Sequence, residues 1–224
     1  MSGLSVVTSE TAFAITSTEV KNWLRIDGSD DDTVITALIK ASHNWARDYT
    51  GRSLTTRTLK MAIDSIYDTD IDIREGQYVG IDQDINRRSI ILPASPVASI
   101  THVKSFDDAD TETTFSSSKY FLDKISVPAR FVLRNGESYP TGLRVANAIE
   151  ITYVAGYGGA SDVPEDIKHA CLMYFAHLFE NRGDNATDKV ISAPFSATRI
   201  LQPYVIRQFS THPYRGTAHY GGML

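Results

Sequence analysis

Hydrophobic side chains recur at steps of three and four residues in two separate parts of the chain. In the first part, residues 30–54, the recurring positions are Val34, Ile35, Leu38, Ile39, Trp45 and Tyr49. In the second part they are Ile167, Ala170, Cys171, Tyr174, Phe175, Leu178 and Phe179. This spacing places the apolar residues on one side of a helix. We therefore predict two amphipathic helices that pack against each other through aromatic side chains.

Both predicted helices have recognisable ends. Asp30 is a good N-cap for the first helix, because its carboxylate can accept a free backbone N–H of the first turn. Gly51 can adopt the left-handed conformation that closes this helix. The second helix is predicted to begin around residues 162–166 (DVPED), where Pro164 and acidic residues suit a first turn. It is predicted to end at Arg182.

A shorter helix is predicted ahead of these two. Thr16 and Glu19 have the spacing of a capping box, and a helix through Leu24 follows from it. A further short helical segment is predicted at residues 196–202. The expected core residues of the helices are Trp23, Leu38, Trp45, Tyr49, Tyr174, Phe175 and Leu178.

Between the two long helices the hydrophobic period changes to two. Residues 56–63 alternate, with Leu59, Met61 and Ile63 on one face, which is typical of a half-buried strand. Further strands are predicted at residues 89–92, 97–106, 120–122, 129–133 and 148–154. This block is expected to form one antiparallel sheet of about five strands.

These patterns predict an α+β fold: a helical bundle core with an inserted antiparallel β-sheet domain and an extended C-terminal tail. The expected divisions are residues 1–15 as an N-terminal arm, 16–54 and 160–183 as the helical core, 55–159 as the inserted β-rich domain, and 184–224 as the C-terminal tail. The arm is expected to contain one strand at residues 4–7.

The C-terminal tail has an unusual composition. Residues 184–224 contain four Lys or Arg and two Asp, so their net charge is 4 − 2 = +2. Their aromatic residues follow no helical or strand period, and disordered segments are normally poor in aromatic residues. We expect the tail to dock on a partner protein, an interpretation favoured over nucleic-acid contact because +2 is a small charge. The docking residues are predicted to be Tyr204, Arg207, Phe209, Tyr214, Arg215 and Tyr220.

Composition excludes several classes of protein. The net charge of -5 argues against a nucleic-acid-binding surface over the whole chain. Cys171 is the single cysteine, so no intramolecular disulfide forms and synthesis in a reducing compartment is expected. No apolar run approaches the roughly 20 residues that span a bilayer, so no membrane association is expected.

Residues with catalytic or metal-binding potential do not form a known motif. The Asp cluster at residues 27–32 suits a helix start better than an EF-hand loop. The acidic segment 64–88 is interpreted as a solvated loop, with a weak cation site as the alternative. Residues 156–159 are rich in glycine but lack the Gly-Lys-Ser/Thr sequence of a phosphate-binding loop, so they are interpreted as a hinge or a tight turn between sheet and helix. We predict no cofactor and no enzymatic activity; a metal-dependent enzyme that uses the acidic segment is the competing hypothesis.

Four groups of residues occur in a distinctive order. They are EVKNWLRID at 19–27 followed by DDD at 30–32 and TGRSL at 50–54, LPASPVASI at 92–100, IEITYVAGYG at 149–158 followed by VPEDIK at 163–168, and FENR at 179–182. This order resembles the signature of the head–tail connector (adaptor) proteins of tailed bacteriophages over about residues 16–182. The acidic segment 64–88 departs from that pattern, and residues 184–224 match it less distinctly.

The resemblance implies a structural virion protein of the head–tail neck, assembled in the host cytoplasm. Twelve copies would form a ring beneath the portal protein and join the capsid to the tail, with genomic DNA passing non-specifically through the channel. The C-terminal segment would reach the portal, and a stopper or tail-terminator protein would bind on the tail side. The alternatives are that the chain is itself a stopper or tail-completion protein, or a DNA-binding accessory protein.

Overall fold

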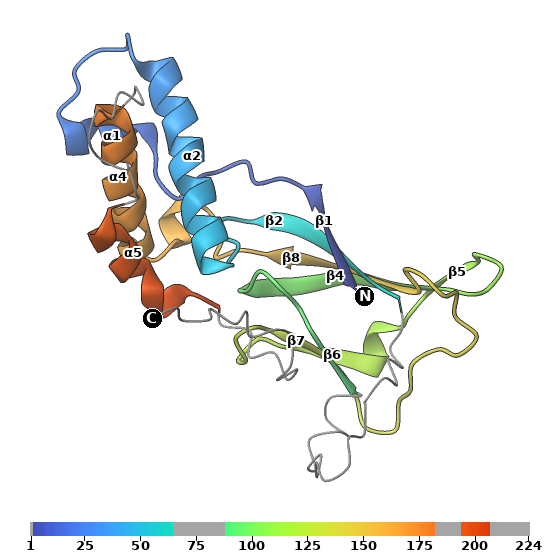
Figure 1. Ribbon diagram of the computed structural model, residues 1–224. Coiled ribbons are helices and arrows are strands. Elements are labelled where there is room, and N and C mark those ends of the chain that lie inside the picture. Colours follow the sequence, from blue (N-terminus) through green and yellow to red (C-terminus); the bar gives the residue numbers. More distant parts are fainter. Residues whose placement is uncertain (1, 65–87, 182–193, 207–224) are drawn as a thin grey trace, which may run out of the picture.

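The computed structural model describes residues 2–64, 88–181 and 194–206. These residues form an α+β fold in which the helices gather at one end and two antiparallel sheets occupy the other (Figure 1). The helices are α1 (Ser17–Leu24), α2 (Asp32–Thr50), α4 (Glu165–Glu180) and α5 (Phe195–Leu201). None of the helices in the described ranges combines the length and the apolar character needed to cross a membrane.

The strands form two sheets in place of the single sheet that was predicted. The larger sheet has the order β1-β2-β8-β4-β5, with β1 (Ser2–Thr8), β2 (Arg57–Ile63), β8 (Ile149–Ala155), β4 (Val97–Phe106) and β5 (Glu112–Thr114). The smaller has the order β3-β7-β6, with β3 (Ser89–Ile91), β7 (Arg130–Leu133) and β6 (Tyr120–Asp123). The hydrophobic period identified the strands, but it contains no information on which strands pair.

The two sheets share one hydrophobic core. Buried residues of the larger sheet, such as Leu59, Ile151 and Tyr153, pack in one cluster with Phe131 and Leu133 of the smaller sheet. All five side chains are at most 4% exposed. The core therefore lies between the sheets, and the predicted common face of Leu59, Met61 and Ile63 is confirmed as the inward face.

The helices enclose a second core. Phe175 of α4 is fully buried among α2, α4 and α5, and Trp45 of α2 stacks on Tyr174 with ring centroids 4.2 Å apart. Leu38 and Leu178 are half-buried. Trp23 and Tyr49 differ from the expected core positions, because they are 47% and 38% exposed. The apolar face of each of these helices is wider than the area that the neighbouring helices cover.

The ends of the helices follow the predicted signals with two exceptions. Thr16 and Glu19 form the predicted capping box at α1, and Gly51 closes α2 with φ +68°. The N-cap of α2 is Asp31 and not Asp30, and it makes no side-chain cap hydrogen bond. At α4, Pro164 precedes the first helical residue.

A buried polar cluster attaches the N-terminal segment to α2. Arg47 Nη1 donates to Glu10 Oε1 over 2.8 Å, and the Ala14 backbone N–H donates to His43 Nδ1 over 3.0 Å. Thr55 Oγ1 donates to the Ala12 carbonyl over 2.7 Å. His43 is 1% exposed, and its burial lowers its pKa to about 4 although the nearby Glu10 carboxylate opposes that shift. The imidazole is therefore neutral near pH 7 and serves as a hydrogen-bond acceptor.

We predict that His43 makes the protein less stable as the pH falls from 6.5 to 4. The unfolded chain binds a proton at His43 below its normal pKa of about 6.5, whereas the folded chain does not until about pH 4. Over that range the free energy of unfolding should fall by about 3 kcal/mol from this group. Urea denaturation at several pH values measures this fall in the free energy of unfolding. His43→Asn, whose amide oxygen can still accept the Ala14 N–H, should flatten this dependence; an unchanged slope would contradict the assignment.

We also predict that Phe175→Ala lowers the free energy of unfolding by about 3–5 kcal/mol, because it opens a cavity in the helical core. Trp23→Ala is the matched control, since Trp23 is larger but 47% exposed. Because Trp23 is only partly buried, losing its edge-to-face contact with His169 and its buried area should cost about 1–2 kcal/mol. Chemical denaturation of both variants checks that Phe175→Ala causes the larger loss of unfolding free energy. A larger loss from Trp23→Ala would contradict the prediction.

Candidate tail-anchoring site

Four segments that are distant in sequence meet where the helices join the larger sheet. They are the turn after α2 (residues 50–56), the turn before β4 (93–96), the turn after β8 (156–158) and the last described residues (204–206). The first three contain signature residues identified in the sequence. Figure 1 shows the ends of α2, β8 and α5 close to this junction.

Backbone hydrogen bonds hold the first three segments together. The N–H of Ser53 donates to the Ala94 carbonyl over 3.3 Å, and the N–H of Gly156 donates to the Pro96 carbonyl over 2.8 Å. The N–H of Thr56 donates to the Gly158 carbonyl over 2.9 Å. Because these bonds use main-chain groups, they need the turns themselves to have the right shape. The proline-rich turn and the glycine-rich turn are thus structural partners of the helix end.

Gly156 allows the closest approach within the junction. It has φ +124°, and a Cβ atom at this position would lie 2.2 Å from the carbonyl oxygen of Thr55. Real Cβ atoms do not approach a backbone atom so closely, so only glycine fits. The interpretation of residues 156–159 as a tight turn between sheet and helix is therefore confirmed.

Arg52 connects this junction to the C-terminal segment. Its Nε donates to the Tyr204 carbonyl over 2.5 Å, and its Nη1 donates to the Tyr157 hydroxyl over 3.3 Å. The Tyr204 hydroxyl donates to Asp166 Oδ2 over 2.9 Å, and this bond to the carboxylate raises the pKa of Tyr204. The guanidinium and the carboxylate thus hold one tyrosine from two sides.

The backbone of the C-terminal segment is also attached to the end of α2. The N–H of Ile206 donates to the carbonyl of Thr50 over 2.9 Å, one of the carbonyls that a helix leaves without an internal partner. Gly51 follows directly, and a Cβ there would contact the Ile206 side chain at 3.8 Å. Residues 204–206 are therefore held at a defined position beside the end of α2.

Of the predicted docking residues, Tyr204 is the one that the structure describes. It is half-buried and bonded within its own chain, so it belongs to the anchor. The others, Arg207, Phe209, Tyr214, Arg215 and Tyr220, lie outside the described residues. Sequence reasoning missed Arg52 and Asp166 as anchor residues. Both belong to signature segments, but a signature does not show which residues meet in space.

The described residues also bear on the chemical alternatives. Among them, no group of three His, Cys, Asp or Glu side chains is placed to hold a metal ion. Cys171 is fully buried, and burial raises the pKa of its thiol to about 12, which suits the predicted core role. Most of the acidic segment 64–88 lies outside the described residues; Asp64 accepts the N–H of Asn147 over 3.0 Å.

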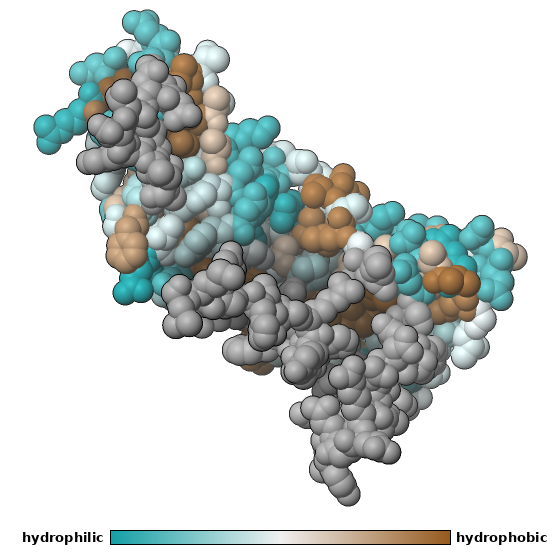
Figure 2. Space-filling view, viewed as in Figure 1, coloured by the Kyte–Doolittle hydropathy of each residue, from teal (hydrophilic) through white to brown (hydrophobic). Residues whose placement is uncertain are grey.

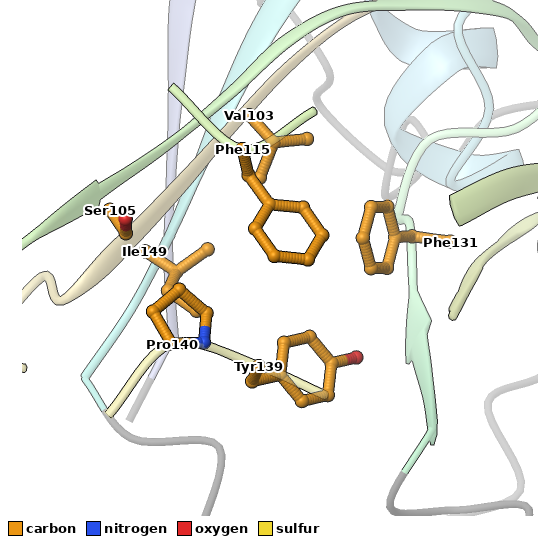
Figure 3. Close-up of a pocket in the computed structure, with 7 residues that line it drawn as sticks. All are labelled: Val103, Ser105, Phe115, Phe131, Tyr139, Pro140 and Ile149. Carbon is orange, nitrogen blue, oxygen red and sulfur yellow. The ribbon is translucent and has the colours of Figure 1, made fainter. Parts of the chain in front are cut away.

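An apolar pocket lies between the two sheets. Phe115, Phe131 and Tyr139 point toward one another there, with Val103, Pro140 and Ile149 around them (Figure 3). The space that they enclose has no room for a water molecule. It is packed core and not a ligand site.

In the junction, the polar groups of Arg52, Tyr204 and Asp166 connect segments that are distant in sequence. Residues 14–192 match the head completion protein family. The chain belongs to this family. The predicted resemblance to connector proteins of the virion neck is thereby confirmed as membership of a head completion family. No curated protein is significantly similar in sequence to the chain.

Solved structures from gene transfer agent (GTA) particles share the fold. A chain from the neck of an empty GTA particle, determined with C6 symmetry, is 21% identical with a TM-score of 0.70, covering 94% of this chain and 100% of that one. A chain from the virion of a native GTA particle is 21% identical with a TM-score of 0.69 and coverages of 92% and 96%. A chain from the native neck, determined with C12 symmetry, is 20% identical with a TM-score of 0.67 and coverages of 94% and 100%.

We predict that Gly156→Ala destabilises the protein more than a comparable change elsewhere. Gly28→Ala is the control, because Gly28 also has a positive φ (+99°) but open space around the Cβ position. The control should cost roughly 1–2 kcal/mol for backbone strain alone. Gly156→Ala should cost about 1–3 kcal/mol more from the clash with Thr55. Equal midpoints in urea denaturation would show that the junction can relax.

Proposed function

We propose that the protein is a structural head–tail adaptor that forms a ring in the neck of a phage-like particle. In this proposal the ring lies beneath the portal protein and joins the capsid to the tail. Membership of the head completion protein family supports a structural, non-enzymatic role. The likeness to neck chains determined with C6 and C12 symmetry supports a cyclic arrangement, and we favour twelve copies.

The observation that carries the portal-docking part of the proposal is the anchor at Arg52. A segment that must reach another protein binds more tightly if its starting point and direction are already set, because less entropy is lost on binding. Arg52, Asp166 and the Thr50 carbonyl set the position of residues 204–206. Residues 207–224, with two Arg and three aromatic residues, follow this anchored point directly. We propose that they dock on the portal.

Net charge supports the passage of DNA through such a ring. Tight binding to duplex DNA requires clustered Lys and Arg that displace counterions. The whole chain carries a net charge of -5. An acidic body suits a channel along which DNA slides without being retained.

We predict that deleting residues 207–224 leaves the fold intact but prevents head–tail joining. The deletion keeps Tyr204 and Ile206, so the anchor and the stability to urea should be unchanged. Particles assembled with the truncated protein should accumulate as heads without tails, which electron microscopy counts. Co-purification of the full-length protein with the portal, and its loss on truncation, checks the partner.

The control replaces residues 207–224 by a Gly/Ser segment of equal length, which separates the role of the side chains from that of chain length. It should fail like the deletion. Normal tailed particles from the truncated protein would refute the docking assignment. Retention of a tail protein without the portal would instead favour a stopper or tail-completion role.

A further inference from the structure

The smaller sheet carries a basic surface on a chain that is acidic overall. Residues 88–91 and 119–137, which contain β3, β6 and β7, have five Lys or Arg and two Asp or Glu, so their net charge is 5 − 2 = +3. The whole chain carries a net charge of -5. We call the exposed residues of these two ranges the basic face. A local reversal of sign of this kind selects a partner by its charge.

Two of the five cations are neutralised within the chain. Lys119 Nζ lies 3.4 Å from a carboxylate oxygen of Glu137, and Arg130 Nη2 lies 2.7 Å from one of Asp123. Pairs of this kind fix the side chains in place but leave no net charge for a partner. The net charge of the basic face therefore comes from the other three cations.

The other three cations have no carboxylate partner within the described part of the chain. Lys124 and Arg134 are exposed, and the Arg134 guanidinium lies 5.8 Å from the centre of the Phe121 ring. Arg88 donates to the amide oxygen of Asn135 over 2.9 Å. Because none of these contacts neutralises charge, the three cations can pair with carboxylates of another molecule.

Exposed apolar side chains accompany these cations. Phe121 is 44% exposed, Ile125 95% and Val127 58%. The phosphate backbone of DNA has no apolar surface that could cover them, whereas protein interfaces combine arginine and aromatic residues with apolar contacts. The basic face therefore suits an acidic protein surface that also carries exposed apolar side chains.

A surface of that description lies at the other end of the same chain. Residues 19–34, which run from α1 into the first turn of α2, have five Asp or Glu and two Lys or Arg, so their net charge is 2 − 5 = -3. We call this region the acidic tip. Its exposed apolar side chains are Trp23 (47%) and Val34 (38%). Figure 2 shows mostly hydrophilic surface at this end of the molecule.

The acidic tip also has carboxylates that are available for pairing. Asp27 and Asp30 are exposed, and neither forms a hydrogen bond or an ion pair within the described ranges. Lys21 is already paired with Asp32, and Arg25 is the exposed cation of the tip. Two unpaired carboxylates thus lie three positions apart, on the turn between α1 and α2.

The turn between β4 and β5 is acidic too, but its carboxylates are mostly occupied. Asp110 and Glu112 form ion pairs within the chain. Asp107 accepts backbone N–H groups of its own turn. Among the described residues of that turn, Asp108 is the one carboxylate without a partner. The acidic tip therefore matches the basic face better than this turn does.

We propose that the basic face of one copy contacts the acidic tip of the neighbouring copy in the ring. The inference rests on the proposed ring and identifies the contact between its subunits. A cyclic assembly needs two different complementary patches on each copy, one facing each neighbour. The tip and the smaller sheet lie at opposite ends of the described fold (Figure 1), and their net charges of -3 and +3 match.

The charged and the apolar residues have different tasks in this contact. Exposed ion pairs stabilise a contact only weakly, so the apolar side chains supply most of the affinity. The charges set the orientation and exclude the pairing of two basic faces or two acidic tips, because like charges would then meet. Head-to-tail contact, which a ring requires, follows from this exclusion.

The first test is cross-linking with a carbodiimide, which joins a lysine amine directly to a carboxylate. In assembled particles it should link Lys124 of one copy to Asp27 or Asp30 of the next and give a ladder of covalent multiples of the chain on denaturing gels. Peptide mass spectrometry identifies the linked residues. Lys124→Arg is the matched control, because it keeps the charge but has no amine; its particles should assemble normally and lose this cross-link.

The second test reverses the charges. Lys124→Glu/Arg134→Glu and Asp27→Lys/Asp30→Lys should each lower the yield of tailed particles about tenfold or more, because like charges then face each other at every contact of the ring. The combination of all four substitutions should restore the yield, because the contact regains opposite charges.

Two charge reversals outside the proposed contact are the controls. Asp108→Lys and Lys40→Glu replace exposed residues that have no ion pair within the described part of the chain, and both should assemble normally. Urea denaturation of the purified variants should show unchanged folding, since none of the replaced side chains forms an ion pair in the described single chain.

The outcomes separate this inference from the proposed function. An intact ring without the Lys124 cross-link, or charge reversals that assemble normally, would overturn the contact and leave the ring standing. A cross-link from Lys124 to a different virion protein, or salt-dependent DNA binding that Lys124→Glu/Arg134→Glu abolishes without loss of assembly, would assign the basic face to another partner and also overturn it. Particles in which the chain forms no ring would refute the proposed function itself.

Discussion

The close approach of Gly156 to the Thr55 carbonyl is the constraint on which the arrangement of the molecule depends. It is the point where the turn after β8 passes directly over the last residues of the segment that leads from α2 into β2. Backbone hydrogen bonds from this point reach Pro96 and Gly158. A methyl group at this position would push the two turns apart and weaken the contacts that position the helices relative to the sheets. The core of the helices and the core between the sheets are thus joined through main-chain contacts.

This rigid junction explains how one small α+β domain can serve as an assembly component. The C-terminal segment is attached at Thr50, Arg52 and Asp166, next to the junction, and the N-terminal segment is attached to α2 through Glu10 and His43. Both ends of the described fold are therefore attached to α2 or to the residues that directly follow it. In the proposed function, the residues beyond the C-terminal attachment dock on another protein while the domain keeps its shape, which would reduce the entropy lost in assembly.

Sequence patterns identified the segments that form the junction, but they could not predict the contacts between those segments. The TGRSL, LPASPV and AGYG segments were identified from their order along the chain, and Gly156 was interpreted as part of a tight turn. Arg52 and Tyr204 are 152 positions apart, and nothing in their local sequence indicates that they bond. Likewise, the strand positions followed from the alternation of residues, but their division into two sheets depends on pairings between strands distant in sequence.

The sequence by itself determined the helices, most of the strands and the capping box of α1, because these depend on interactions among residues a few positions apart. It also determined membership of a connector-like family through the order of short segments. Only the tertiary structure decided which parts of each apolar stripe are covered. Trp23 and Tyr49 are partly exposed and Leu4 and Val6 lie on an open edge, because burial depends on where neighbouring elements end and not on the period of the sequence.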